Sequence, residues 1–144
     1  MTCSSDETTL LHMLPILQRI IGLTDTHKQF GITKSQIVIF IVLHYKGSMT
    51  MSEAAQYISS SKEQATRTVA VLCDNGLVER YEDSGNRTHV FIRLTDKGKE
   101  QLQQLISKFR FEIAQRLSAS LSEDEIQMLE QSLHTAAVIL SKVK

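Results

Sequence analysis

The sequence has no tryptophan, one proline and six glycines among its 144 residues. Glycine and proline are the residues that tight turns use most, and a fold built from many strands needs such turns often. Their scarcity argues against a β-rich fold and predicts a mainly α-helical protein with long helices and few turns. The length is enough for one domain with a substantial core and too short for two ordinary domains.

Neither sign of charge is in excess, because 16 Lys and Arg balance 16 Asp and Glu. The balance excludes a uniformly cationic nucleic-acid coat and an acidic disordered chain, and it leaves room for a local basic patch. The longest apolar run, Ile37 to Leu43, is seven residues, and crossing a bilayer takes roughly 20. The N-terminus has neither the cationic start nor the apolar core of a signal peptide, so we expect a cytoplasmic protein.

Cysteine and histidine are too few and too scattered for a metal site or a disulfide framework. Cys3 and Cys73 form neither a zinc set nor a network of bridges, and the five histidines contain no H-x-x-x-H pair. Cys73 could sense oxidants, although a small, partly buried residue is the commoner role. No phosphate loop, nucleophile elbow or paired-carboxylate motif is found. We therefore expect no cofactor, no metal and no enzymatic activity.

Apolar residues spaced three and four apart predict amphipathic helices at both ends of the chain. Near the N-terminus two stripes lie side by side: Leu10, Leu14, Leu17 and Ile21, and Met13, Ile16, Ile20 and Leu23. Pro15 lies within this pattern, so the helix should kink there or begin close to it. Two further helices are expected after residue 101, with a break at 118–121 and a capping box at Ser122 and Glu125.

The middle of the chain contains three candidate helix starts of one type. Each has a hydroxyl residue followed three positions later by Glu or Gln, which is a capping box: Thr33 and Gln36, Thr50 and Glu53, and either Ser60 and Glu63 or Ser61 and Gln64. They predict a buried helix through about Tyr45, a short helix over 51–59 and a third helix to Asn75. Gly47 and Gly76 should end the first and third helices. This order is the outline of a helix-turn-helix.

A β-hairpin is predicted directly after the third of these helices. Residues 77–82 and 88–94 alternate and are rich in β-branched and aromatic side chains, and residues 83–86 form a turn signal. Thr95 should cap the return to helix. A hairpin in this position is a wing.

The sequence GLVERYEDSGNRTHVFIRLTDKGKE, residues 76–100, resembles the wing of the MarR family of bacterial transcription regulators, and SSKEQATRTVAVLCDNGLVER resembles its recognition helix. The resemblance implies a mainly α fold with a small β wing. It places one domain over 1–144, with a winged helix-turn-helix at about 32–98. The flanking segments, about 5–30 and 99–144, would be dimerisation helices.

The recognition helix and the wing supply the candidate DNA-binding residues. Ala65, Val69 and Leu72 recur at core spacing, which leaves other side chains near the outward face of the first two turns: Ser61, Lys62, Gln64, Thr66 and Arg67. These types include donors to base edges and to phosphates. The alternative is an ordinary solvated helix face.

The wing candidates are Asn86, Arg87 and Thr88. The resemblance makes Arg87 the wing arginine that reaches the minor groove, and an exposed arginine at a hairpin tip is the alternative. The family often has an acidic residue followed by two arginines, and Asn86-Arg87-Thr88 departs from that pattern.

The resemblance further implies a homodimer that reads a pseudo-palindromic double-stranded operator as a repressor. Its effector would be a small lipophilic or phenolic ligand. A monomeric helical bundle beside the winged module is the alternative to the dimer. Residues 60–99 hold seven Lys or Arg and six Asp or Glu, so a winged module that contacts proteins and lacks DNA affinity is the alternative function.

Overall fold

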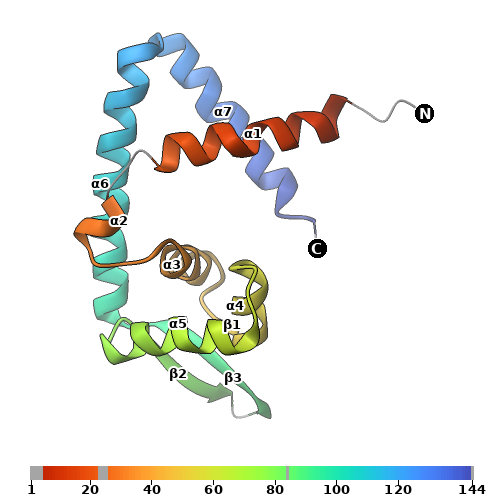
Figure 1. Ribbon diagram of the computed structural model, residues 1–144, viewed down its shortest axis with the longest axis vertical. Coiled ribbons are helices and arrows are strands. Elements are labelled where there is room, and N and C mark those ends of the chain that lie inside the picture. The colour runs from red at the N-terminus through yellow and green to blue at the C-terminus, as the bar shows by residue number, and fades with distance from the viewer. Residues whose placement is uncertain (1–4, 23–25, 84, 144) are drawn as a thin grey trace. The chain divides into compact units, whose positions relative to one another are not determined.

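The computed structural model describes residues 5–22, 26–83 and 85–143; for residues 5–8, 26–27 and 86–88 it describes only the backbone. The helices are α1 (Ser5–Gly22), α2 (Thr26–Gln29), α3 (Lys34–Lys46), α4 (Met51–Tyr57), α5 (Lys62–Asp74), α6 (Asp96–Ser120) and α7 (Glu123–Leu140), and the strands are β1 (Met49–Thr50), β2 (Val78–Asp83) and β3 (Asn86–Leu94). The expected fold class, mainly helical with a small β wing, is confirmed (Figure 1). None of the helices in the described ranges is long and apolar enough to cross a membrane.

The chain divides into two compact units. One comprises Gly22–Lys108 and holds α2 to α5, the sheet and the first part of α6. The other comprises Met1–Ile21 and Phe109–Lys144, and it holds α1, the rest of α6 and α7. Helix α6 therefore contributes residues to both units. We call them the winged unit and the terminal-helix unit.

Helix starts follow local sequence closely. The capping boxes at Thr33, Thr50 and Ser122 each have both reciprocal hydrogen bonds, as expected. At the start of α5 the N-cap is Ser61, whose hydroxyl accepts from the backbone N–H of Gln64 at 3.2 Å. Gly76 follows the last turn of α5 with φ +71°, a conformation that glycine adopts without steric cost.

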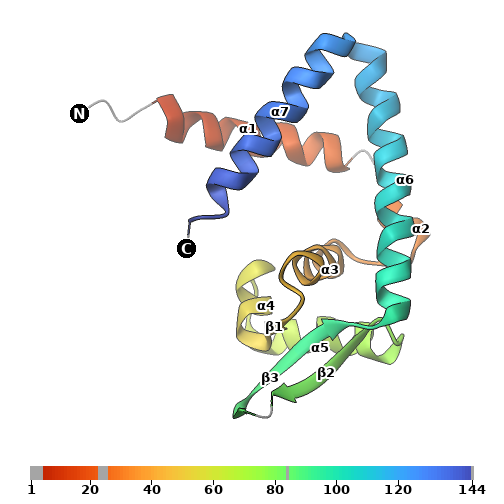
Figure 2. The same cartoon turned by 180° about the vertical axis from the view of Figure 1, so that it is seen from behind.

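The wing belongs to a three-stranded antiparallel sheet in the order β1-β3-β2. Val78 pairs with Leu94 at one end of the hairpin, and the register shifts between Glu82 and Asp83 near the turn. The short strand β1, which the sequence analysis did not predict, pairs Met49 with Ile92. Figure 2 shows the hairpin projecting beyond α5. The expected hairpin is confirmed, with strands one or two residues longer toward the turn.

The buried core lies in the winged unit. It is formed by side chains from α3, α4, α5, the sheet, the first turns of α6 and the residues just before α3 and β2: Ile32, Ile39, Phe40, Leu43, Met49, Ala54, Val69, Leu72, Leu77, Val78, Ile92, Leu94, Leu102 and Leu105. Ala65, Val69 and Leu72 of α5 are at most 1% exposed, so the predicted core face of this helix is confirmed. This packing determines which side of α5 faces outward.

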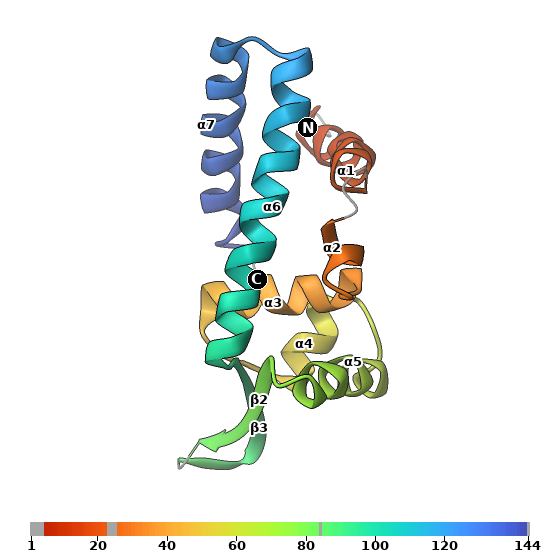
Figure 3. The same ribbon diagram turned by 90° about the vertical axis from the view of Figure 1, so that its left-hand side faces the viewer.

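The terminal-helix unit is different, because its apolar side chains remain largely exposed. On α7 no described residue is buried, and Leu133 is 39% and Leu140 48% exposed. Helix α1 passes through Pro15 without ending, so the expectation that it could begin near Pro15 is wrong. Proline removes one backbone N–H, and the remaining hydrogen bonds keep the helix continuous. Figure 3 shows α7 turning back after the end of α6.

Candidate nucleic-acid interface

Helix α5 follows α4 through a tight turn, and this turn sets the helix-turn-helix geometry. The backbone N–H of Ser60 donates to the carbonyl of Ala55 at 3.0 Å. Ser59 has φ +50°, a left-handed conformation that few non-glycine residues adopt. Helix α4 ends at Tyr57, two residues before the expected end, because the chain already turns here.

The first two turns of α5 present a polar outward face. Lys62, Gln64, Thr66 and Arg67 are all exposed, while Ala65 between them is fully buried. A cationic, amide and hydroxyl set on one helix end can donate to purine edges and to phosphate oxygens.

Two of the candidate hydroxyls are already engaged within the helix. The Ser61 hydroxyl accepts the capping hydrogen bond, so its proton remains available to donate. The Thr66 hydroxyl donates to the carbonyl of Lys62 at 2.8 Å, which leaves its oxygen lone pairs to accept. The longer side chains on this face, which can extend to DNA bases and phosphates, are therefore Lys62, Gln64 and Arg67.

Glu63 lies on the same outward face and was missed by sequence reasoning. Its side chain is exposed in the first turn of α5, where a carboxylate is favoured by the helix dipole. A glutamate there repels phosphates but can accept from the amino group of cytosine. The signal was its position between Lys62 and Gln64, which puts it outside the core stripe.

The wing turn lies between β2 and β3, with Asp83 paired to Asn86. The side chains of Asn86, Arg87 and Thr88 lie outside the described residues. Their backbone belongs to the first part of β3, at the end of the hairpin farthest from Leu94.

A cross-strand cluster stiffens one face of the wing. The Arg93 Nε donates to the Glu79 carboxylate at 2.6 Å, and the Arg93 guanidinium lies 4.3 Å from the Tyr81 ring centroid. Tyr81 in turn stacks on Phe91, with centroids 5.7 Å apart. We call Glu79, Arg93, Tyr81 and Phe91 the wing ladder. It was not foreseen, because it requires the strand register. It pairs one acid of the segment with one cation, so the net charge of the segment is unchanged.

The wing is tied to the end of α5 and the start of α6. The Thr95 hydroxyl donates to the Gly76 carbonyl at 2.6 Å and accepts from the Gly98 backbone N–H at 3.0 Å. The predicted cap at Thr95 is thus confirmed. A Cβ on Gly98 would collide with the carbonyl of Leu77, so α6 approaches the strand start closely.

The described residues offer few other groups that could react or bind a metal. Burial raises the pKa of the Cys73 thiol, and the nearby Arg80 acts in the opposite direction. A thiol with a raised pKa is a poor nucleophile at neutral pH. Cys3 lies outside the described residues. Among the described ranges, no group of three or more His, Cys, Asp or Glu could hold a metal ion.

Comparison with known proteins identifies this architecture. Residues 32–90, which contain the helix-turn-helix and most of the wing, match the model of the MarR family. A solved MarR family protein from Bacillus stearothermophilus superposes with a TM-score of 0.73 at 26% identity. That match covers 96% of this chain and 100% of the other.

Two curated relatives that match in sequence are named as transcription regulators. The uncharacterised HTH-type transcriptional regulator YsmB of Bacillus subtilis is 31% identical over 105 residues, which are 73% of this chain and 71% of YsmB. The transcriptional repressor MprA of Escherichia coli K12 is 30% identical over 106 residues, 72% of this chain and 60% of MprA. The polar face of a capped recognition helix, the adjoining wing and these matches agree, and this chain belongs to the MarR family of helix-turn-helix transcriptional regulators.

Proposed function

We propose that this protein is a sequence-specific repressor that binds double-stranded DNA as a homodimer. The observation that carries the proposal is the exposed polar face at the start of α5, with the wing attached directly behind it. A recognition helix inserts its N-terminal residues into the major groove. Lys62, Gln64, Thr66 and Arg67 are the side chains that would meet base edges and phosphates there.

The wing would contact the backbone or minor groove beside the recognition helix. We assign this contact to Asn86, Arg87 and Thr88 because they follow the turn of the hairpin. A long cationic side chain such as Arg87 suits the negative potential of a narrow minor groove. The wing ladder supports the contact by keeping the hairpin stiff, since Arg93 is engaged with Glu79 and Tyr81.

The exposed apolar faces of the terminal-helix unit support the homodimer. Leu10, Leu14 and Ile21 of α1 are each more than half exposed, and Leu133 and Leu140 of α7 are also exposed. Exposed apolar surface on this scale marks an interaction site. A second copy of the chain would cover these faces and present two recognition helices to a pseudo-palindromic operator.

Repression follows from occupancy of a promoter, and the family resemblance implies relief by a small effector. An effector would act by binding one dimer geometry better than the other. The protein would work in the cytoplasm by binding rather than by catalysis.

The test is fluorescence anisotropy with a labelled duplex from the region upstream of the gene, against a shuffled duplex of equal composition. We expect tighter binding to the native duplex, and an affinity that falls steeply as salt rises because phosphate contacts release counterions. Equal binding to both duplexes would contradict sequence-specific binding to this upstream region. Absence of binding to any duplex at low salt would favour the protein-contact module.

That second candidate has one observation in its favour. Residues 60–99 are nearly neutral, with seven Lys or Arg and six Asp or Glu. A protein-contact module would keep its dimer and show no dependence on duplex sequence at any salt concentration.

A further inference from the structure

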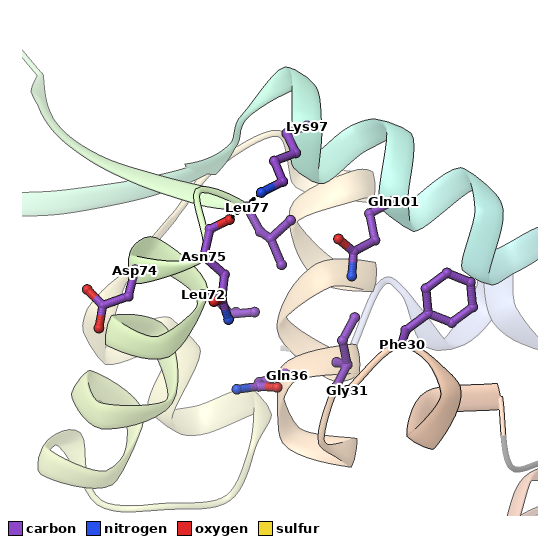
Figure 4. Close-up of a pocket in the computed structure, with 10 residues that line it drawn as sticks. Phe30, Gly31, Gln36, Leu72, Asp74, Asn75, Leu77, Lys97 and Gln101 are labelled. Carbon is purple, nitrogen blue, oxygen red and sulfur yellow. Dashed lines mark hydrogen bonds between the residues drawn. The ribbon is translucent and has the colours of Figure 1, made fainter.

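A cavity of about 460 Å³ opens in the winged unit, at the opposite end of α5 from Lys62 and Arg67. Its volume is within the range of small-molecule sites. Figure 4 shows its walls, which come from the segment before α3, the first turn of α3, the end of α5 and the first turns of α6. Its polar lining includes Gln36, Asn75, Lys97 and Gln101.

Gln36 contributes a polar side chain to the cavity wall. Its side chain is only 5% exposed, and its Oε1 accepts from the backbone N–H of Thr33 at 2.9 Å. The other half of the amide, Nε2, donates to no atom of the described residues and points across the cavity toward α5 (Figure 4). No buried side-chain nitrogen or oxygen of the described residues lacks a hydrogen-bond partner, so this nitrogen is open to the cavity. A ligand oxygen there can accept from it in place of water.

Lys97 supplies positive charge to the same space. Its ammonium donates to the backbone carbonyl of Asn75 at 2.9 Å and carries three hydrogens, so two remain for another acceptor. Gln101 lies one turn further along α6 and extends toward the cavity from the same side (Figure 4). Lys97 is the one cationic residue of this wall, and the carboxylate of Asp74 points away from it.

We propose that this cavity binds a small hydrophilic carboxylate, such as a hydroxy acid, and that its occupancy changes DNA affinity. The second half rests on the proposed function. The carboxylate would accept from Lys97 in a charge-assisted hydrogen bond, and ligand hydroxyls would meet the amides of Gln36, Gln101 and Asn75. These polar walls do not suit the lipophilic or phenolic effector that the family resemblance implies, so this site is a different one.

Occupancy of the cavity would affect DNA binding through the C-terminal end of α5, the recognition helix. Asn75 is the C-cap of α5, and its carbonyl is held by Lys97 at the start of α6. A ligand that draws hydrogen bonds from Lys97 changes how the end of α5 is tied to α6. The two geometries need only differ in ligand affinity for occupancy to change operator binding.

The first experiment measures binding without DNA. The ¹⁵N-labelled full-length protein is titrated to millimolar concentrations with D-gluconate, L-malate and citrate, and with neutral sorbitol as the control. We expect at least one acid to shift the side-chain amide of Gln36 and the backbone amides of Asn75 and Lys97 with saturation. No saturable shift of the Gln36 amide with any acid overturns the site, and an equal response to sorbitol overturns the preference for a carboxylate.

Two variants distinguish a specific role of Lys97 in the cavity from a general effect of positive charge on α6. Lys97→Gln removes the cation from the cavity, and Lys99→Gln removes an exposed cation two residues away. A charge-assisted hydrogen bond contributes about 1.5–3 kcal/mol, so Lys97→Gln should weaken acid binding about tenfold or more. Lys99→Gln should leave binding nearly unchanged, and equal losses in both variants would contradict the role of Lys97.

The second experiment adds the acid that bound to the anisotropy assay. We expect the operator affinity of the wild type to change about fivefold or more, and that of Lys97→Gln to stay constant. An unchanged affinity in the wild type overturns the regulatory half. Absence of DNA binding in all conditions overturns the proposed function instead, and the titration without DNA still decides whether the cavity is a site.

Discussion

At the scale of single residues, Arg67 is the strongest candidate for DNA contact on α5. It is exposed on the outward face, and a guanidinium can bond guanine or phosphate in a bidentate manner. We expect Arg67→Ala to weaken operator binding by about 1–3 kcal/mol, with the melting temperature unchanged because no buried contact is lost. Anisotropy at several salt concentrations measures the effect.

The matched control for this substitution is Arg110→Ala, an exposed arginine on α6 far along the chain from the recognition helix. It removes the same charge and should preserve operator affinity. If both variants lose affinity equally, Arg67 contributes only net charge. If Arg67→Ala binds a mutated operator as well as it binds the native one, the Arg67 side chain contributes to recognition of the bases.

We predict that the Cys73 thiol is a poor nucleophile at neutral pH. Its pKa is raised by burial, with the charge of Asp74 acting in the same direction and Arg80 acting against it. Only the thiolate is nucleophilic, so the thiol should react more slowly at pH 7 than free glutathione. The rate of iodoacetamide labelling in a Cys3→Ser variant isolates Cys73 and tests this. Faster labelling than glutathione, or DNA binding lost on peroxide treatment, would restore the oxidant-sensing hypothesis.

At the scale of elements, the cap of α4 links its stability to pH. The pKa of Glu53 is lowered, first by the backbone N–H of Thr50 that donates to it, and further by Lys46, whose Nζ lies 3.2 Å from its Oε1. The folded state therefore holds the carboxylate more strongly than the unfolded chain does. This contribution is present at neutral pH and is lost as pH falls through the lowered pKa, below the ordinary value of 4.5.

Substitution of Glu53 by Gln tests the linkage. The amide oxygen can still accept from Thr50, but it carries no charge to lose. Thermal melts at pH 7 and pH 3 should show a smaller acid-induced drop in Tm for Glu53→Gln than for the wild type. An equal drop in both proteins would mean that other carboxylates govern acid sensitivity.

The junction between the wing and α6 depends on the missing side chain of Gly98. A Cβ at this position would overlap the carbonyl of Leu77, which is backbone and cannot rotate away. We expect Gly98→Ala to reduce the free energy of unfolding by about 1–3 kcal/mol. Chemical denaturation measures this loss.

Gly22→Ala is the control, because a Cβ on Gly22 meets no atom within 4 Å. Alanine favours helix and restricts the unfolded chain, so this variant should be as stable as the wild type or more so. A comparable loss at both positions would contradict the steric explanation for Gly98.

For the molecule as a whole, the exposed apolar faces predict that a substitution on them can prevent dimerisation without unfolding the chain. Leu133 on α7 is 39% exposed in the single chain. We expect Leu133→Glu to dissociate the proposed dimer, because a charge buried in an apolar interface is costly. The exposed Gln131→Glu on the same helix should remain dimeric.

Analytical ultracentrifugation of both variants gives the oligomeric state, and circular dichroism shows whether the helices persist. A monomeric wild type would favour the helical bundle beside the winged module. A dimeric Leu133→Glu would place the interface elsewhere.

Most of the elements could be predicted from the sequence, because helix starts and core faces depend on neighbours within one or two turns. The boxes at Thr33, Thr50 and Ser122 were readable from spacing, and each is formed in the structure. The core stripe of α5 was readable in the same way. The candidate face at Lys62, Gln64, Thr66 and Arg67 followed by elimination, and its exposure agrees with that reasoning.

The features that join distant segments could not be predicted from the sequence, because they depend on how the whole chain packs. Strand β1 is too short to show a pattern, and it exists because β3 offers Met49 and Thr50 a partner. The wing ladder needs the register that brings Arg93 to Glu79. The cavity needs Gln36 and Lys97, 61 positions apart, to face one space. Long-range pairing depends on where the whole chain packs, whereas capping and periodicity are written in consecutive residues.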